Sequence, residues 1–257
     1  MALRRILNTR HYKIITPIDT PWIYHNSDLW LISLSSNGSN WITIADKNLW
    51  ATTVYNSWDT LSEANCGKYY QWGNNYGFPR TWSVTTSTAQ VNAQNYWPWN
   101  YYSDSTFRSN WWTSRSWDSS WNQNLWWWTT DTNSAKQWPC NSWYHIPSKI
   151  EYVNLLSLLT NIWIDTTSRW STFNTYLLMP LSWNRDWNSG TVSNQWTTWF
   201  YWSASWSTAA ASSRLVFWTN ATPNTWTNEA TYWEMIRPFK NEAVTPDWTW
   251  TVLYQAN

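Results

Sequence analysis

One segment of the chain has the apolar periodicity of a buried helix. Between Ser148 and Ile162 apolar residues fill most positions. Ser148 and Glu151 have the spacing of a capping box, in which each side chain accepts a hydrogen bond from the other residue's backbone N–H. A helix that is apolar around most of its circumference packs against other structure on at least two sides. We therefore predict a scaffold helix over 148–162, interrupted only by a narrow polar line at Asn154, Ser157 and Asn161.

Short apolar and aromatic runs on both sides of this helix predict strands, because such residues bounded by turn residues are typical of a pleated sheet. The predicted strands are Leu29–Leu34, Ile42–Ile44, Asn174–Leu181, Trp199–Ser205, Arg214–Phe217 and Tyr232–Phe239. A polar loop of small residues separates 199–205 from 214–217, so we expect these two strands to pair in antiparallel fashion. The chain is thus predicted to be α+β, with small antiparallel sheets, one main helix and long irregular loops.

The regions without this periodicity divide the chain into parts. Residues 80–137 are rich in Ser, Thr, Asn and Trp but poor in aliphatic residues, which predicts surface loops without a core of their own. The tail after Lys240 is rich in turn residues and is expected to be loose. We predict an N-terminal extension or first strand over 1–41, a main domain over 42–241 and a loose C-terminal tail over 242–257.

Two residue counts are unusual: the chain has 31 tryptophans and 5 glycines. Typical glycine usage is about 7%, which would give roughly 18 glycines in a chain of this length. Many tryptophans stand where a turn dipeptide would carry glycine. Examples are Asn40-Trp41, Asn110-Trp111, Ser142-Trp143, Ser182-Trp183, Asp186-Trp187, Ser205-Trp206 and Asp247-Trp248. Trp163 likewise stands where the end of the predicted helix favours a left-handed residue.

We hypothesise that many of these tryptophans are glycines encoded by UGA, which some bacterial lineages read as glycine. Each buried indole needs on the order of 150–250 Å² of cover. A run such as Trp126–Trp128 would be hard to cover in a chain this polar. The alternative is a protein that is truly rich in tryptophan, and the intact mass of the protein from its own host separates the two.

The charge balance and hydropathy exclude several function classes. A formal net charge of +1 gives no electrostatic case for binding nucleic acid or an anionic membrane surface. No apolar run approaches the roughly 20 residues that span a bilayer. The first residues also lack the apolar core of about 7–15 residues that a secretory signal carries.

Several blocks, in the correct order, resemble the Fibrobacter succinogenes major paralogous domain family, which has a C-type-lectin-like fold. The longest block reads Pro139–Ser148 with Glu151 and Tyr152, and resembles that family's Cys-Pro-x-Gly-Trp-His-(Val/Leu)-Pro-(Ser/Thr) motif. The other matching blocks are Ile44–Trp50, Tyr70–Gly73, Gly77–Pro79, Leu181–Asp186, Tyr201–Ser203 and Met235–Lys240. The resemblance covers roughly residues 42–241.

This resemblance implies one or two helices against small antiparallel sheets, with the chain ends close together and irregular loops on a ligand-binding side. The family usually has glycine at the positions of Trp50, Trp143, Trp183 and Trp233, which agrees with the decoding hypothesis. It usually has tryptophan at the positions of Trp72, Trp126 and Trp202, so we expect those three to be genuine.

Some domains of this fold type are diversified by retroelements that rewrite codons near the C-terminus. The density of Ser, Thr, Asn and Ala between Tyr201 and Thr231 is compatible with such diversification, and equally with plain surface loops. Small polar and aromatic side chains on loop-facing strands suit ligand contact. The candidate ligand-binding residues are Arg185, Asn188, Tyr201, Ser203, Ser205, Thr208, Ser212, Arg214, Asn220 and Asn224.

The residue types of catalytic and metal sites do not assemble in this sequence. His145, beside the predicted helix start, is interpreted as a structural hydrogen-bonder, because no nucleophile or paired carboxylate can be placed near it. Cys66 and Cys140 are interpreted as a disulfide or as two inert thiols. Neither the ligand number of a zinc site nor the calcium-binding triplets of C-type lectins occur, so we expect no metal and no cofactor.

The prediction for the whole chain is a non-catalytic ligand-binding domain that is extracellular or displayed on the cell surface, as a receptor or adhesin. The expected partner is a protein or a glycan, with no nucleic acid and no membrane span. Two other classes stay open. A formylglycine-generating type of enzyme would need a reactive cysteine pair, and a carbohydrate-binding module would need genuine tryptophans that form a flat aromatic platform.

Overall fold

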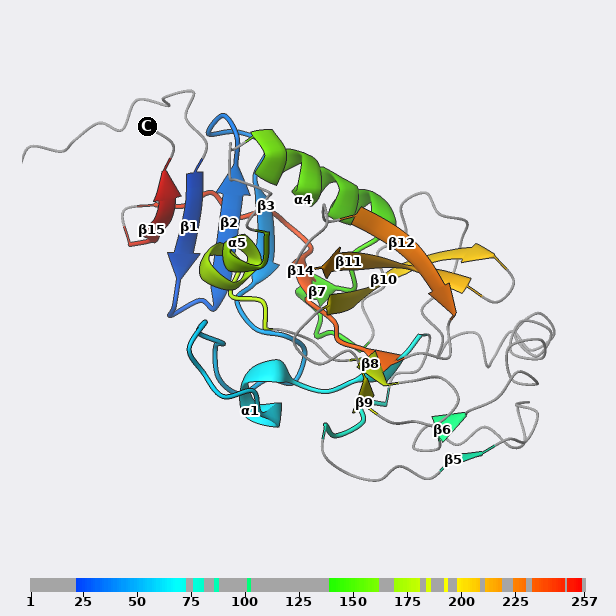
Figure 1. Ribbon diagram of the computed structural model, residues 1–257. Coiled ribbons are helices and arrows are strands. Elements are labelled where there is room, and N and C mark those ends of the chain that lie inside the picture. The colour runs from blue at the N-terminus through cyan, green and yellow to red at the C-terminus, as the bar shows by residue number, and fades with distance from the viewer. Residues whose placement is uncertain are drawn as a thin grey trace, which may run out of the picture.

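The computed structural model describes residues 22–72, 76–80, 86–87, 101–102, 139–161, 169–180, 184–185, 192–193, 198–208, 211–218, 224–229, 233–247 and 249–255. Within these residues the fold is α+β, with few helices and mainly antiparallel sheets, as predicted (Figure 1). In the described part of the chain, no helix has the length and apolar character needed to cross a membrane.

A six-stranded sheet contains strands from both ends of the described chain, in the order β15-β1-β2-β3-β14-β7. Its apolar side chains include Ile23, Ile32, Leu34 and Ile44, which are fully buried in the main core cluster. The strand bounds are Trp22–Asn26 for β1, Leu31–Ser35 for β2, Ile42–Ala45 for β3, Tyr144–His145 for β7, Phe239–Lys240 for β14 and Thr251–Gln255 for β15. The described part of the predicted N-terminal extension thus forms two strands of this sheet.

The last strand of this sheet differs from the prediction of a loose tail. Strand β15 pairs with β1 in antiparallel fashion, from Trp22 opposite Gln255 to His25 opposite Thr251. Figure 1 shows β15 and β1 side by side at one edge of the sheet. The segment looked loose because its short alternating pattern gains a partner only from the other end of the chain.

The predicted scaffold helix is confirmed as α4, Lys149–Asn161. Its capping box is formed, because the Ser148 N–H donates to Glu151 Oε2 at 2.7 Å and the Glu151 N–H donates to Ser148 Oγ at 3.2 Å. Ile150 and Val153 are exposed, so α4 is covered over less of its circumference than expected. Its buried side chains are Tyr152, Leu155, Leu158 and Leu159.

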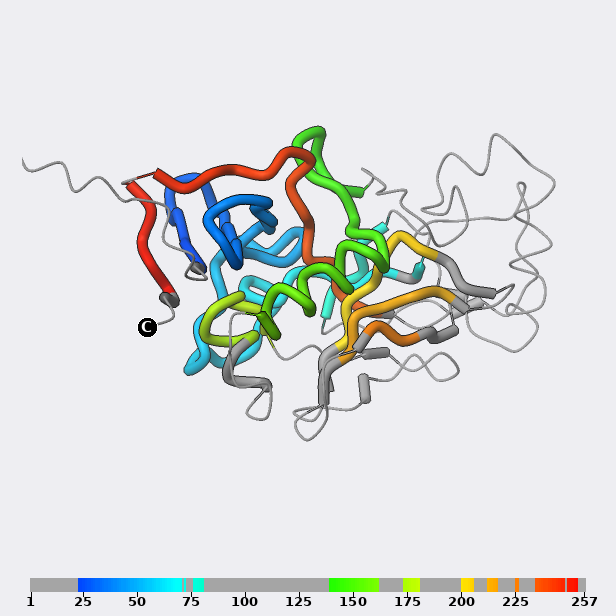
Figure 2. Tube along the Cα trace, turned by 90° about the horizontal axis from the view of Figure 1, so that it is seen from above, coloured from blue at the N-terminus to red at the C-terminus, as the bar shows by residue number. Residues whose placement is uncertain are grey.

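Helix α4 connects the six-stranded sheet with a second, three-stranded sheet. Tyr152 packs edge-on against Phe239 of β14, with ring centroids 5.5 Å apart. The Tyr152 hydroxyl donates to the carbonyl of Trp202 at 3.2 Å. The view in Figure 2 shows α4 between the strands of the two sheets.

The three-stranded sheet has the order β10-β11-β12, with bounds Thr198–Thr208, Ala211–Trp218 and Asn224–Glu229. The predicted antiparallel pairing of 199–205 with 214–217 is confirmed, with Tyr201 opposite Leu215. Two smaller sheets complete the described strands. They are the four-stranded β4-β13-β8-β9 (Tyr70–Gln71, Trp233–Glu234, Asn184–Arg185, Val192–Ser193) and the parallel pair β5-β6 (Thr86–Ser87, Tyr101–Tyr102).

Two predicted strands after α4 are wrong. Asn174–Leu181 was expected to be extended, but its first residues end helix α5, Arg169–Tyr176, and Leu177–Pro180 lie outside any strand. Phe173 and Leu177 are one helical turn apart and both buried, which is the helical signal that the apolar run obscured. Tyr232–Phe239 is also divided, since β13 and β14 belong to different sheets.

Backbone conformation separates some tryptophans from the others. Trp30 and Trp50 have φ angles of 63° and 64°, in the left-handed region that favours glycine. The true glycine Gly67 has φ 75° at the end of helix α1, Glu63–Cys66. A Cβ atom there would collide with the backbone carbonyl of Leu49, next to Trp50.

Candidate functional site

Five of the predicted ligand contacts are buried in the described structure. Tyr201, Ser203, Ser205, Ser212 and Arg214 lie on β10 and β11, and the most accessible of them is 9% exposed. The prediction assumed that small polar residues on these strands face the loops. The structure instead turns these five side chains inward, where several of them hold neighbouring segments together.

The partners of these side chains are internal. The Tyr201 hydroxyl donates to the Pro180 carbonyl at 2.9 Å. Ser203 Oγ donates to the Ser213 carbonyl at 2.8 Å, across the β10–β11 pair. Ser205 Oγ accepts the Lys149 N–H at 2.9 Å, so that it caps the first turn of α4. Burial raises the pKa of Tyr201, although the nearby Arg237 guanidinium opposes the shift, so the phenol stays protonated.

The other five predicted contacts are placed less fully. Arg185 lies on β8, Thr208 near the end of β10 and Asn224 at the start of β12. Asn188 and Asn220 lie outside the described residues. The β10–β11 connection and the start of β12 are therefore the parts of the three-stranded sheet where the prediction of ligand contact stays open.

Two tryptophans join the three-stranded sheet to the four-stranded one, and we call this pair the indole joint. Trp72 and Trp202 are fully buried. The indole N–H of Trp72 donates to the Ser203 carbonyl, and that of Trp202 donates to the Tyr70 carbonyl, each at 2.8 Å. A buried indole needs such a partner, because an unpaired N–H away from water is costly. Both residues are among the tryptophans that the sequence identified as genuine.

A buried ion pair lies close to this joint. Arg214 on β11 donates through Nη1 to Glu234 Oε1 on β13, and the Glu234 side chain is fully buried. The Arg214 guanidinium also lies 4.1 Å from the centroid of the Phe200 ring. The pair is held between two sheets, so Arg214 serves their packing.

Two residues of the matched motifs, Asn48 and Arg237, tie distant segments together. The side-chain amide of Asn48 faces the Cys66 carbonyl at 2.9 Å, the Tyr201 hydroxyl and the Met235 sulfur. The fully buried Arg237 donates to the carbonyls of Ala45 and Leu178. These contacts give the Ile44–Trp50 block and the Met235–Lys240 block a structural role, which the sequence alone did not assign.

His145 is a structural hydrogen-bonder, as predicted. Its Nε2 lies 2.8 Å from Glu151 Oε1, and its Nδ1 lies 2.9 Å from Asn241 Oδ1. The amide nitrogen of Asn241 is committed to the Ser142 carbonyl, so both imidazole nitrogens face acceptors. Desolvation lowers the pKa of His145, but the hydrogen bond and charge of Glu151 and the bond to Asn241 outweigh it, and the pKa is raised.

The two cysteines are free thiols and both are buried, so of the two expected states, a disulfide or two separate thiols, this structure has the second. Burial raises the pKa of Cys66 to about 11, although Arg80, whose Nη1 lies 3.2 Å from the sulfur, opposes the shift. Burial also raises the pKa of Cys140. Protonated buried thiols are poor nucleophiles. Among the described residues, no group of three or more His, Cys, Asp or Glu side chains could hold a metal ion.

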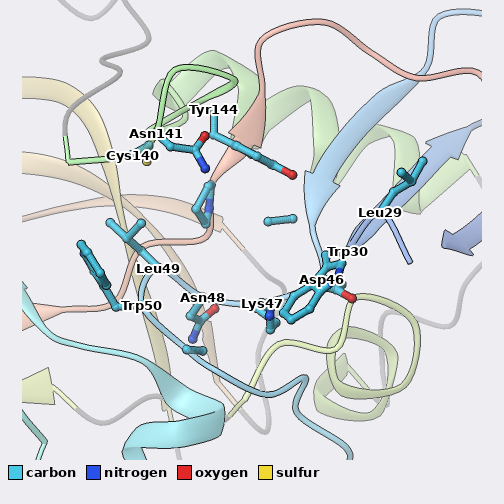
Figure 3. A pocket seen from close by; sticks show the side chains of 13 residues that line it. Leu29, Trp30, Asp46, Lys47, Asn48, Leu49, Trp50, Cys140, Asn141 and Tyr144 are labelled. Carbon is cyan, nitrogen blue, oxygen red and sulfur yellow. The ribbon is translucent and has the colours of Figure 1, made fainter. Parts of the chain in front are cut away.

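A pocket of about 280 Å³, which we call the rim pocket, lies between three segments of the chain (Figure 3). Leu29 and Trp30 come from the turn before β2, residues 45–51 follow β3, and Cys140, Asn141 and Tyr144 precede α4. Pro238, just before β14, completes the wall. Trp30 and Trp50 narrow the pocket from different sides, as Figure 3 shows.

Sequence reasoning did not place ligand contacts here. Yet the rim pocket is built from two of the motifs it identified, the Ile44–Trp50 block and the Pro139–Ser148 block. Their order along the chain could not show that they meet, because the contact depends on the pairing of β14 with both β3 and β7. No family model, curated protein or solved structure matches the chain.

Proposed function

We propose that the chain is a non-catalytic ligand-binding domain with a C-type-lectin-like fold, exported or displayed on the cell surface as a receptor or adhesin. The observation that carries this proposal is the pairing of β1 with β15, which brings the two ends of the domain together. A separate three-stranded sheet lies across α4 from that pair. This arrangement agrees with what the resemblance implies, namely close chain ends and small antiparallel sheets around a main helix.

The state of the cysteines supports binding over formylglycine-type catalysis. Such catalysis needs an accessible, activated thiol, whereas Cys66 and Cys140 are 1% and 2% exposed and their thiol pKa values are raised. Alkylation with iodoacetamide under native conditions tests this point. We expect neither thiol to react before unfolding, and rapid native alkylation together with loss of an oxidase activity would favour the enzyme.

The proposed contact residues on the three-stranded sheet are Thr208, the last residue of β10, and Asn224, the first residue of β12, which lie at opposite ends of the sheet. Arg185 lies on β8 of the four-stranded sheet, and Asn188 and Asn220 stay candidates from the sequence alone. If a retroelement diversifies this gene, the variable codons should fall in 206–224 and should spare Ser203, whose hydroxyl donates to the backbone carbonyl of residue 213 across the β10–β11 pair. A reverse transcriptase gene with a near-identical template repeat beside this gene would support diversification, and a template covering Ser203 would count against this surface.

The binding proposal is tested with the purified domain and two kinds of probe. One is a glycan array with insoluble cellulose, chitin and xylan, and the other is a set of surface proteins from neighbouring cells. We expect saturable binding to a member of one set, abolished when the domain is unfolded by heat. Absence of binding to both sets, together with turnover of a thiol substrate, would contradict the proposal.

A further inference from the structure

We propose that the rim pocket is a binding site for a small neutral molecule rich in hydroxyl groups, such as one saccharide unit, and that it needs no metal ion. This inference rests on the proposed function and gives it a place and a ligand class. It concerns a different part of the molecule from the candidate contact residues on the three-stranded sheet.

Unpaired acceptor atoms are the first reason. Asp46 Oδ1 and Asn48 Oδ1 are buried and have no hydrogen-bond partner in the described structure, although both residues line the rim pocket. Buried acceptors are nearly always paired, so such atoms call for an explanation. Both atoms are inaccessible from the pocket itself, so they act on a ligand through the negative potential that they add to this wall, which favours groups that present hydrogen-bond donors.

Charge compensation then favours a neutral ligand. The other oxygen of Asp46, Oδ2, lies 3.0 Å from His25 Nε2, and the buried Arg237 guanidinium interacts electrostatically with the same carboxylate. Lys47 places an ammonium group on the pocket wall. The negative potential of Asp46 disfavours an anion, and the Lys47 ammonium, which lies over the Trp30 ring, disfavours a cation, whereas a neutral polyol is penalised by neither.

The remaining wall has the mixture that a sugar ring requires. Leu49 and Pro238 provide apolar surface for C–H faces, while Asn141 and the phenol of Tyr144 provide hydrogen-bonding groups. A mainly apolar lining with a few convergent polar groups is typical of small-ligand sites. With Trp30 and Trp50 in its wall, the pocket has a volume of about 280 Å³, which limits the ligand to roughly one ring; glycine at both positions would widen it.

The test is a titration of the isotope-labelled domain with glucose, galactose, mannose, N-acetylglucosamine and myo-inositol, in buffer with EDTA, followed by NMR. We expect amide shifts confined to residues 45–51 and 140–144, with Kd in the millimolar range. Tyr144→Phe should weaken binding at least threefold. The matched control Tyr24→Phe, which removes a half-buried phenol outside the pocket, should leave Kd unchanged. If the sugars shift these amides and myo-inositol does not, the ligand class is a saccharide rather than a general polyol.

Two results would overturn this inference, and they differ in what they say of the proposed function. Saturable amide shifts outside residues 45–51 and 140–144, with no effect of Tyr144→Phe on Kd, would reject the rim pocket as the site. They would still support ligand binding by the domain. No shift with any of the five compounds would reject the ligand class. The proposed function fails only if the glycan and surface-protein probes also fail to bind.

A second inference rests on backbone angles alone. We infer that positions 30 and 50 are glycine in the protein made by its own host, and that positions 72 and 202 are tryptophan. Trp30 and Trp50 have positive φ and are 46% and 64% exposed, so their rings gain little from burial and their backbones carry the cost of a left-handed conformation. Trp72 and Trp202 are fully buried and their indole N–H groups are paired.

Sequencing of the gene tests this second inference directly. We expect UGA at codons 30 and 50 and UGG at codons 72 and 202, and we expect peptides from the host protein to carry the mass of glycine at the first two positions. UGG at codon 30 or 50, or UGA at codon 72 or 202, would overturn the assignment.

Discussion

The indole joint and the rim pocket each contain two tryptophans, and they use these residues in opposite ways. In the joint, Trp72 and Trp202 fill the space between two sheets, and each donates a hydrogen bond to a backbone carbonyl of the facing segment. At the pocket, Trp30 and Trp50 stand largely in solvent on left-handed backbone. The same side chain therefore stabilises one region and strains the other.

The difference lies in what each position requires. A buried indole contributes through the apolar area it removes from water and through its paired N–H. A left-handed residue is chosen for its backbone, and any Cβ there costs about 1–2 kcal/mol. Substitution by glycine is therefore expected to have opposite signs in the two regions, because the joint loses a buried ring and the pocket loses a strained backbone.

The largest expected effect is in the indole joint. Trp202→Gly should lower the free energy of unfolding by at least about 4 kcal/mol, because it leaves a large cavity, an unpaired Tyr70 carbonyl and a glycine within a strand. Urea unfolding followed by far-UV circular dichroism measures the change. Trp226→Gly is the matched control, since Trp226 is a strand residue of the same sheet but 53% exposed. A loss at position 202 no larger than at 226 would contradict the role of the joint.

The ion pair beside the joint should follow in size. Glu234→Gln keeps the shape of the side chain but leaves the Arg214 guanidinium without its counter-charge in a buried site. Removal of one partner from a buried pair costs about 3–5 kcal/mol. We expect a loss near the lower limit, measured by the same urea titration, and Glu242→Gln on the exposed surface should change stability little. Equal, small effects at both positions would show that Arg214 is not held by Glu234.

The rim pocket should respond in the opposite direction. Trp50→Gly and Trp30→Gly should each raise the free energy of unfolding by about 1 kcal/mol, because glycine adopts positive φ without a steric cost. The control is Trp58→Gly, since Trp58 is 95% exposed but does not have positive φ. That change should leave stability unchanged or lower it by up to about 1 kcal/mol. Destabilisation at position 50 equal to that at position 58 would contradict the argument from φ.

The smallest expected effect is a pH dependence at the start of α4. The raised pKa of His145 adds stability that is complete below its unfolded value of about 6.5 and is lost as pH rises through the folded pKa. Desolvation raises the pKa of Glu151, but the hydrogen bond and charge of His145 and the bonds from Ser148 lower it by more, so the pKa of Glu151 is lowered overall. The stability from Glu151 is therefore present above its unfolded pKa and lost as pH falls through the folded one.

Chemical denaturation between pH 4 and 9 tests this window. The stability advantage of the wild type over His145→Gln should be greatest near pH 5–6 and should shrink as pH rises toward 9. Ser148→Ala serves as the control, because it removes the helix cap without removing the imidazole. An advantage that grows from pH 6.5 to 9 would contradict the assignment.

Local signals allowed correct predictions where neighbours in sequence determine the structure. Ser148 and Glu151 are three residues apart, and their capping box identified the start of α4. The β10–β11 pair was predictable because a short connection joins its strands. Strand β15 was missed because its partner β1 lies at the other end of the chain. Helix α5 was missed because the run from Leu177 to Leu181 hid the helical spacing of Phe173 and Leu177.

The candidate site shows the same limit. Sequence reasoning expected Ser203, Ser205 and Arg214 to face a ligand, because polar residues are usually exposed. Their burial depends on partners from β11, α4 and β13 that no local pattern reveals. The rim pocket was missed for a related reason, since Asp46 and Tyr144 meet only after β14 has paired with β3 and β7. The residues of these blocks could be singled out in the sequence, but their proximity required tertiary structure.

The pairing of β1 with β15 also has a consequence for synthesis on the ribosome. Strand β1 emerges early, whereas residues 251–255 are added only at the end of the described chain. Until then one edge of β1 keeps its backbone N–H and C=O groups without their final partner. An unpaired edge of this kind is a template for association with other chains, so β1 stays open to such pairing until β15 has been synthesised.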